Sequence, residues 1–176
     1  CAAFEPREVF EAQGMLVVMT RSGLVVLREE EGVGLRALGR LEDSEQTAGY
    51  VRGGVAAIEE GFRVAAWRRD GVVRTVDVVV KDGSVSFAPG APDVGLRIAE
   101  GRQPFMRAAM VARDTLVLTD GGSLNVVRLQ AASARIFTRR EQVAQATVVD
   151  VAAAGEEGFD VATSRFGAVE VERVEQ

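Results

Sequence analysis

Two stretches that lie far apart in this chain repeat the same order of short apolar strands and glycine-containing turns. Gly53–Val80 and Val151–Val174 each contain Val-Ala-Ala, then Glu-Glu-Gly-Phe, then Val-Ala, at nearly the same spacing. Hydrophobic residues recur with period two or in short runs, which predicts β-strands, and they rarely fall at helical spacing. A chain with an internal repeat of this kind is expected to build copies of one small β unit.

The rest of the chain divides into units of the same kind. Corresponding strands begin at Met15, Phe62, Leu116 and Phe159, which gives spacings of 47, 54 and 43 residues. The middle spacing is the longest because a loop rich in proline and glycine, Ala88–Gly95, interrupts it. We therefore expect a single all-β domain. Its four quasi-repeats cover residues 8–49, 50–105, 106–146 and 147–176.

These units resemble β-propeller repeats of the WD-repeat-like and quinoprotein-like kind, on a Val-Ala-Ala inner strand, a following apolar strand and glycine turns. The resemblance implies about four blades of three to four antiparallel strands, since propeller repeats are about 40–50 residues long. The Trp-Asp and Gly-His pairs of true WD repeats are absent, as is the strong tryptophan pattern of quinoprotein-type blades. A β-sandwich or barrel is the alternative all-β fold.

Composition excludes several classes of function. The chain has 176 residues, a net charge of −5 and no histidine. A negative net charge argues against a nucleic-acid groove. The missing histidines remove the commonest general base and the commonest transition-metal ligand. We expect no nucleic-acid partner, no metal and no cofactor.

Cys1 is the only cysteine, and Ala-Ala follows it. A mature chain that begins in this way resembles a processed bacterial lipoprotein, in which the first residue is acylated. That resemblance implies a domain held at the cell envelope, on the periplasmic or outer surface, with membrane association through the acyl chains alone. The alternative is that Cys1 is incidental to where the sequence starts.

Several acidic residues are candidates for a carboxylate site, because two carboxylates suffice for glycoside hydrolysis. They are Glu59, Glu60, Asp77, Asp93, Glu156, Glu157 and Asp160. The two Glu-Glu pairs occupy equivalent repeat positions just before a glycine, so we expect solvated turn tips rather than a catalytic pair. Asp82-Gly83 and Asp120-Gly121 also predict turns, since neither segment has the ligand pattern of a calcium loop. We therefore expect no catalytic residue.

Tyr50 and Trp67 are the only residues of their kinds, and both are candidate interface residues because aromatic side chains anchor protein interfaces. For Trp67, packing between neighbouring blades is the expected role. The function expected from the resemblance is a non-enzymatic protein-binding or assembly module. One alternative is a small-ligand or carbohydrate-active propeller with a carboxylate site, and another is one part of a larger composite propeller.

The fourth quasi-repeat offers only three strands, where the second and third offer four. An unpaired strand edge favours association with another strand. We expect Glu8–Gln13 to supply the missing strand next to Ala168–Val174 and so to close the ring. The competing expectation is that this edge pairs with another chain, which gives an oligomer or a composite propeller.

Overall fold

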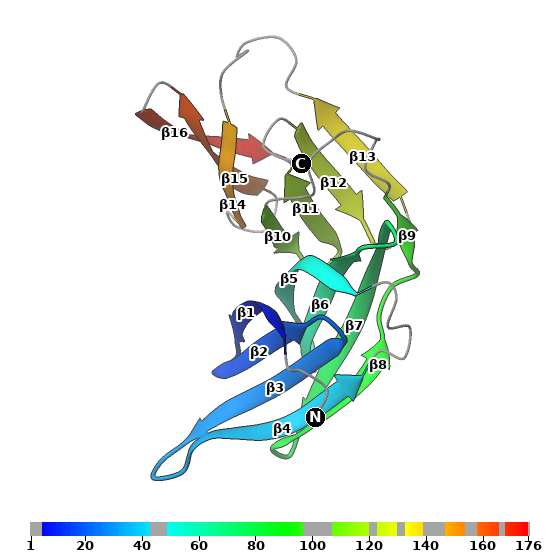
Figure 1. Ribbon diagram of the computed structural model, residues 1–176, viewed down its shortest axis with the longest axis vertical. Helices are drawn as coiled ribbons and strands as arrows, with labels where there is room; N and C mark the ends of the chain where they lie inside the picture. The colour runs from blue at the N-terminus through cyan, green and yellow to red at the C-terminus, as the bar shows by residue number, and fades with distance from the viewer. Residues whose placement is uncertain are drawn as a thin grey trace.

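The computed structural model describes residues 5–42, 49–96, 107–119, 123–129, 133–138, 147–153, 158–165 and 168–175. Within these ranges the chain forms sixteen β-strands and no helix (Figure 1). Every strand pairing is antiparallel, and the strands form four separate sheets. The all-β class predicted from the hydrophobic pattern is confirmed.

The first and second sheets are antiparallel meanders, in which each strand pairs with the next one along the chain. The first sheet contains β1 (Pro6–Ala12), β2 (Met15–Thr20), β3 (Gly23–Glu30) and β4 (Gly34–Glu42). The second contains β5 (Tyr50–Ile58), β6 (Gly61–Arg68), β7 (Val72–Lys81) and β8 (Ser84–Pro89). A short extra strand, β9 (Val94–Gly95), pairs with the beginning of β7.

The third and fourth sheets follow the same plan. The third contains β10 (Arg107–Ala112), β11 (Thr115–Thr119), β12 (Ser123–Arg128) and β13 (Ser133–Thr138). The fourth contains three strands in the described part of the chain, namely β14 (Thr147–Ala153), β15 (Gly158–Arg165) and β16 (Ala168–Glu175). In Figure 1 the four sheets follow one another along a curved path, from the blue first sheet to the orange and red fourth sheet.

Two of the tight hairpins depend on residues with positive φ. Asp82 and Gly83, between β7 and β8, have φ of 50° and 75°, and Gln13 and Gly14, between β1 and β2, have φ of 51° and 72°. Positive φ at both central residues is the geometry of a type I′ turn, whose twist matches that of the flanking strands. The Asp-Gly signal in the sequence therefore marks a hairpin, as predicted.

Alternation along each strand supplies apolar side chains to both faces of the interior sheets. On β6, Phe62 and Val64 pack against the first sheet, while Ala65 and Trp67 pack against the third. On β11, Leu116 and Leu118 face the second sheet, and Val117 joins the cluster shared with the fourth. Successive side chains of a strand point to opposite faces. Three separate hydrophobic cores result, one between each pair of neighbouring sheets.

The first strands of the sheets lie next to one another. β5 contacts both β1 and β10, and β10 also contacts β14. Gly54 lies at the closest approach of β5 and β10, where a Cβ atom would collide with the backbone nitrogen of Met110. Only a residue without a side chain allows the two backbones to approach in this way.

The stacked meanders, with their first strands side by side, are compatible with a propeller-like fold. One expectation about this arrangement is wrong. Glu8–Gln13 was expected next to β16, but Glu8–Ala12 pairs with β2 as the first strand of the first sheet. The reason is local, because the type I′ turn at Gln13-Gly14 joins this segment directly to Met15–Thr20. Pairing with a strand so close in sequence loses the least chain entropy on loop closure.

Candidate functional site

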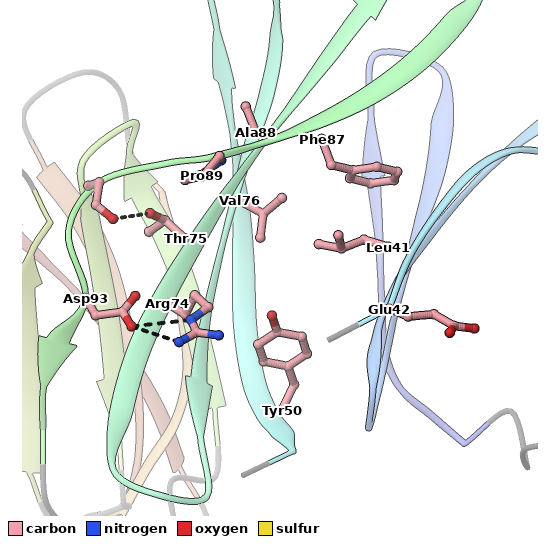
Figure 2. Close-up of a pocket in the computed structure, with 11 residues that line it drawn as sticks. Leu41, Glu42, Tyr50, Arg74, Thr75, Val76, Phe87, Ala88, Pro89 and Asp93 are labelled. Atoms are coloured by element: carbon pink, nitrogen blue, oxygen red, sulfur yellow. Dashed lines mark hydrogen bonds and ion pairs between the residues drawn. The ribbon is translucent and has the colours of Figure 1, made fainter. Parts of the chain in front are cut away.

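A cavity of about 410 Å³ lies between the first and second sheets (Figure 2). It is bordered by the end of β4, the beginning of β5 and the outer strands of the second sheet. Its lining residues are Leu41, Glu42, Tyr50, Arg74, Thr75, Val76, Phe87, Ala88, Pro89, Ala91 and Asp93. A volume of this size falls within the range of ligand pockets.

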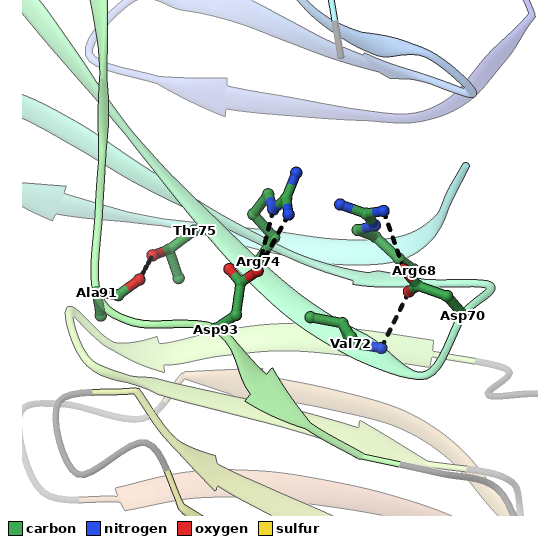
Figure 3. Close-up of polar contacts among 7 residues, drawn as sticks. All are labelled: Arg68, Asp70, Val72, Arg74, Thr75, Ala91 and Asp93. Atoms are coloured by element: carbon green, nitrogen blue, oxygen red, sulfur yellow. Dashed lines mark hydrogen bonds and ion pairs between the residues drawn. The ribbon is translucent and has the colours of Figure 1, made fainter. Parts of the chain in front are cut away.

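One side of the cavity is fixed by polar contacts where the outer strand of the second sheet is interrupted. The Gly90 N–H donates to the carbonyl of Thr75 at 3.1 Å, and the Thr75 hydroxyl donates to the carbonyl of Ala91 at 3.0 Å. Two guanidinium nitrogens of Arg74 contact one carboxylate oxygen of Asp93, at 3.1 and 3.3 Å (Figure 3). These bonds hold the segment between β8 and β9 against β7.

The opposite side of the cavity is apolar. Leu41, Val76 and Phe87 line it, and the Tyr50 ring lies beside them (Figure 2). Tyr50 is only 4% exposed and belongs to the core shared by the first two sheets. The cavity therefore offers apolar contacts next to an ion pair, which suits a small group with one apolar and one polar end.

The candidate carboxylates described by the structure are not brought together. Asp77 accepts two hydrogen bonds from Arg63, at 2.6 and 2.8 Å, and these bonds raise the pKa of the Arg63 guanidinium. Asp160 similarly pairs with Arg173 at 3.1 Å, as Asp93 does with Arg74. Each aspartate thus has its own arginine on a neighbouring segment.

Of the two glutamate pairs predicted as turn tips, one lies within the described residues and the other does not. Glu59 and Glu60 form the exposed turn between β5 and β6, and the Glu60 carbonyl accepts a hydrogen bond from the Val80 N–H at 2.9 Å. Glu156 and Glu157 lie outside the described residues, as do Gly121 and Cys1. The predictions that concern those residues stay predictions.

Trp67 is buried between the second and third sheets. It is 5% exposed, and its indole N–H donates to the carbonyl of Leu96 at 3.1 Å. The packing role expected for Trp67 agrees with this position, and its role at an interface stays a prediction. Tyr50 borders the cavity between the first and second sheets.

A half-buried carboxylate that sequence reasoning missed joins the first two sheets. Glu8 on β1 accepts a hydrogen bond from the Gly53 N–H on β5 at 2.6 Å, and Arg52 lies 3.6 Å from its other oxygen. Burial raises the pKa of the Glu8 carboxyl, while the Gly53 hydrogen bond and the charges of Arg52 and Arg107 act to lower it. The sequence gives no local signal for this contact, since its partners are 45 residues apart.

Exposed large apolar side chains are confined to the two end sheets. Among the described residues they are Val9, Val33, Leu35, Val169 and Val171, with exposures between 56% and 72%. Val33 lies in the turn between β3 and β4, and the other four lie on strands. The second and third sheets have neighbours on both sides, and no exposed large apolar residue is found among those of their side chains that the structure describes, which exclude β13.

Strand register places the four strand residues on the faces that point away from the rest of the molecule. Val9 pairs with Val18, on the opposite face from the core residue Val17. Val171 pairs with Ala162, on the opposite face from the core residue Val161. We call these surfaces the first outer face and the fourth outer face. The first contains Val9, Glu11, Leu16, Val18, Val25, Leu27, Leu35 and Arg40, and the fourth contains Ala152, Asp160, Ala162, Val169, Val171 and Arg173.

The described part of the chain holds no group of three or more cysteine, aspartate or glutamate side chains that could bind a metal ion. None of its segments is a helix long and apolar enough to cross a membrane. In comparisons with known proteins, no protein-family model matches this chain, and no curated protein resembles it significantly.

Proposed function

We propose that this chain is a non-enzymatic assembly module, built as consecutive blades of a propeller-like fold, that binds protein partners through its outer faces. The observation that carries the proposal is that every exposed large apolar side chain which the structure describes belongs to one of the two end sheets. Contiguous exposed apolar surface on a soluble protein marks interaction sites. The apolar stretches of the interior sheets are covered by neighbouring sheets of the same chain.

The orientation of β16 supports this proposal most directly. Glu170 and Glu172 lie on the face of β16 that is shared with the core residue Val161, whereas Val169 and Val171 point outward. Glu170 and Glu172 are exposed on that face, and Val169 and Val171 are exposed on the opposite face, where a strand that ends an isolated domain is expected to carry polar residues. The outward valines are explained if another protein surface covers them.

The proposal is tested by placing a photo-crosslinking amino acid at Val171, at Val9 and, as a control, at Glu59 in the exposed β5–β6 turn. Illumination in cells that produce the protein is expected to join Val171 and Val9 to protein chains, identified by mass spectrometry, and to leave Glu59 unlinked. If the outer-face positions give no more crosslinked protein than Glu59, the outer faces are not interaction surfaces and the proposal is wrong.

The cavity beside Tyr50 favours a second candidate function, the binding of a small ligand. Its apolar wall and the Arg74–Asp93 ion pair supply both kinds of contact that a small amphipathic molecule needs. A carbohydrate-active version has less support, because Asp93 is held by Arg74. Screening a small-molecule library for an increase in melting midpoint tests this candidate, with a Tyr50→Phe variant as a check that hits bind in the cavity.

A further inference from the structure

We propose that a small pocket lined by three arginines, at the junction of the first and second sheets, binds a phosphate group. The pocket holds about 10 Å³ and is lined by Arg7, Arg21, Gly49, Tyr50 and Arg69. Tyr50 also lines the larger cavity, and the other four residues do not. The site is therefore distinct from that cavity, and it does not involve the outer faces.

Three segments that are far apart in the sequence bring the arginines to this pocket. Arg7 belongs to β1, Arg21 to the turn between β2 and β3, and Arg69 to the turn between β6 and β7. The Tyr50 N–H donates to the Arg21 carbonyl at 3.2 Å, and the Arg69 N–H donates to the Gly49 carbonyl at 3.1 Å. Two consecutive residues thus fix the backbone of both turn arginines.

Gly49 allows Arg21 to lie against the pocket wall. A Cβ atom at residue 49 would lie 2.8 Å from the Cγ atom of Arg21 and 2.9 Å from the Arg21 carbonyl oxygen. Both separations are shorter than a van der Waals contact, so a residue with a side chain would push Arg21 away. The aliphatic part of the Arg21 side chain therefore lies directly over a residue that lines the pocket.

The carboxylates that neighbour these arginines in the sequence already have partners. Glu5 contacts Arg7 at 3.2 Å, and Glu8 makes the contacts with β5 described above. Asp70 contacts the buried guanidinium of Arg68 at 2.9 Å (Figure 3). These carboxylates therefore compensate other charges or bond to backbone.

Arg21 and Arg69 form no ion pair with any carboxylate in the part of the chain that the structure describes, and both are exposed. Two uncompensated positive charges beside one pocket contrast with the net charge of −5 for the whole chain. A phosphate group carries a charge of about −1.5 to −2 near pH 7, which matches these two charges. Phosphate binding would therefore compensate both arginines at once.

The size of the pocket also favours a phosphate group. A volume of about 10 Å³ is close to the space that one water molecule occupies, so the pocket can admit one phosphate oxygen. The remaining oxygens stay outside, where the exposed side chains of Arg21 and Arg69 can donate to them. The planar fork of a guanidinium group matches two phosphate oxygens, and Arg7 has further donors besides the one that contacts Glu5.

The test measures binding of inorganic phosphate and of glycerol phosphate by isothermal titration calorimetry. The titrations are made at about pH 7.5, where phosphate monoesters are mainly dianions, with sodium chloride keeping the ionic strength constant. The unaltered chain is expected to bind one phosphate group per chain. Tighter binding of glycerol phosphate would identify the ligand as the phosphate end of a larger molecule, and tighter binding of inorganic phosphate would identify the free ion.

Arg21→Gln with Arg69→Gln removes the two uncompensated charges. Both positions are exposed, so we expect an intact fold, which circular dichroism checks. The affinity for the tighter ligand should fall about a hundredfold or more, because each charge-assisted hydrogen bond contributes about tenfold. Arg36→Gln with Arg40→Gln is the matched control, since it removes two exposed arginines that pair with glutamates of the first sheet. The control should bind phosphate as the unaltered chain does.

The single variants Arg21→Gln and Arg69→Gln are measured as well, and each should lose about tenfold in affinity. They decide the question if the double variant does not fold. The proposal is wrong if the unaltered chain shows no saturable binding of either ligand. It is also wrong if the variants at Arg21 and Arg69 bind as tightly as the unaltered chain, or if the Arg36 and Arg40 control loses as much affinity as they do. Crosslinking at the outer faces tests the proposed function separately, so either proposal can fail without the other.

Discussion

The second and fourth sheets are built from the same kind of alternating strand, but their apolar residues are buried to different extents. On β6 of the second sheet, residues of both parities are buried, because the first sheet covers Phe62 and Val64 and the third covers Ala65 and Trp67. On β15 of the fourth sheet, Phe159 and Val161 are buried against the third sheet, whereas Val169 and Val171 on β16 face the other way and are about two-thirds exposed. The difference teaches that apolar alternation alone does not determine burial. A neighbouring sheet does.

The largest effect on stability is expected from removing a buried side chain in an interior core. Leu118 is fully buried between the second and third sheets, so Leu118→Ala should lower the free energy of unfolding by about 2–5 kcal/mol. Val171→Ala, on the fourth outer face, should change it by no more than about 0.5 kcal/mol. Urea denaturation at a concentration where the chain is monomeric compares the two. Similar losses of unfolding free energy for both variants would contradict the difference in burial between interior and end sheets.

The junction between the second and third sheets offers the next test. Gly54→Ala places a methyl group against the backbone of β10 at Met110, and backbone cannot rotate away as a side chain does. We expect a loss of about 1–3 kcal/mol, the usual cost of overpacking. Gly95→Ala is the matched control, since nothing lies within 4 Å of its added Cβ. Equal melting midpoints for the two variants would mean that β5 and β10 do not approach so closely.

The junction between the first and second sheets should respond to pH through Glu8. Burial raises the folded-state pKa of Glu8 above the ordinary value of 4.5. Its contribution to stability is therefore fully present below pH 4.5 and is lost as the pH rises through the raised value. Glu8→Gln does not titrate and retains an acceptor for the Gly53 N–H. Its stability relative to the unaltered chain should therefore increase from pH 4 to pH 7.

Urea midpoints measured across that pH range test the Glu8 prediction. Glu59→Gln, in the exposed β5–β6 turn, controls for the loss of a carboxylate elsewhere on the second sheet. Parallel pH curves for Glu8→Gln and the unaltered chain would show that Glu8 does not link this junction to pH.

The smallest effect on stability is expected at Cys1, which precedes the first sheet. If Cys1 carries the acyl anchor that its position and the following Ala-Ala predict, Cys1→Ser should move the protein from the membrane fraction to the soluble fraction. The urea midpoint of the soluble domain should not change, because the acyl chains contact lipid rather than a core. Continued membrane association of Cys1→Ser would contradict the anchor.

The candidate sites show where sequence reasoning succeeded and where it could not. The equivalent positions of the Glu-Glu pairs predicted that Glu59 and Glu60 form a turn, because a turn is specified by residues close in sequence. The cavity beside Tyr50 and the Glu8–Gly53 hydrogen bond were not predicted. Both are formed by residues from different sheets, and no local pattern encodes which sheets will meet.

The sequence by itself determined most of the strands, several of their tight turns and the all-β class. β9 is an exception, because Val94–Gly95 lies within Ala88–Gly95, which the sequence predicted as a loop. Period-two alternation and turn signals such as Asp82-Gly83 involve only a few consecutive residues. They can therefore be recognised without knowing which sheets pack against one another. Only the tertiary structure decided that Trp67 is buried and that Val169 and Val171 point away from the third sheet. The chemistry of a valine or tryptophan side chain is the same on either face of a strand. Which face is covered therefore depends on the stacking of whole sheets.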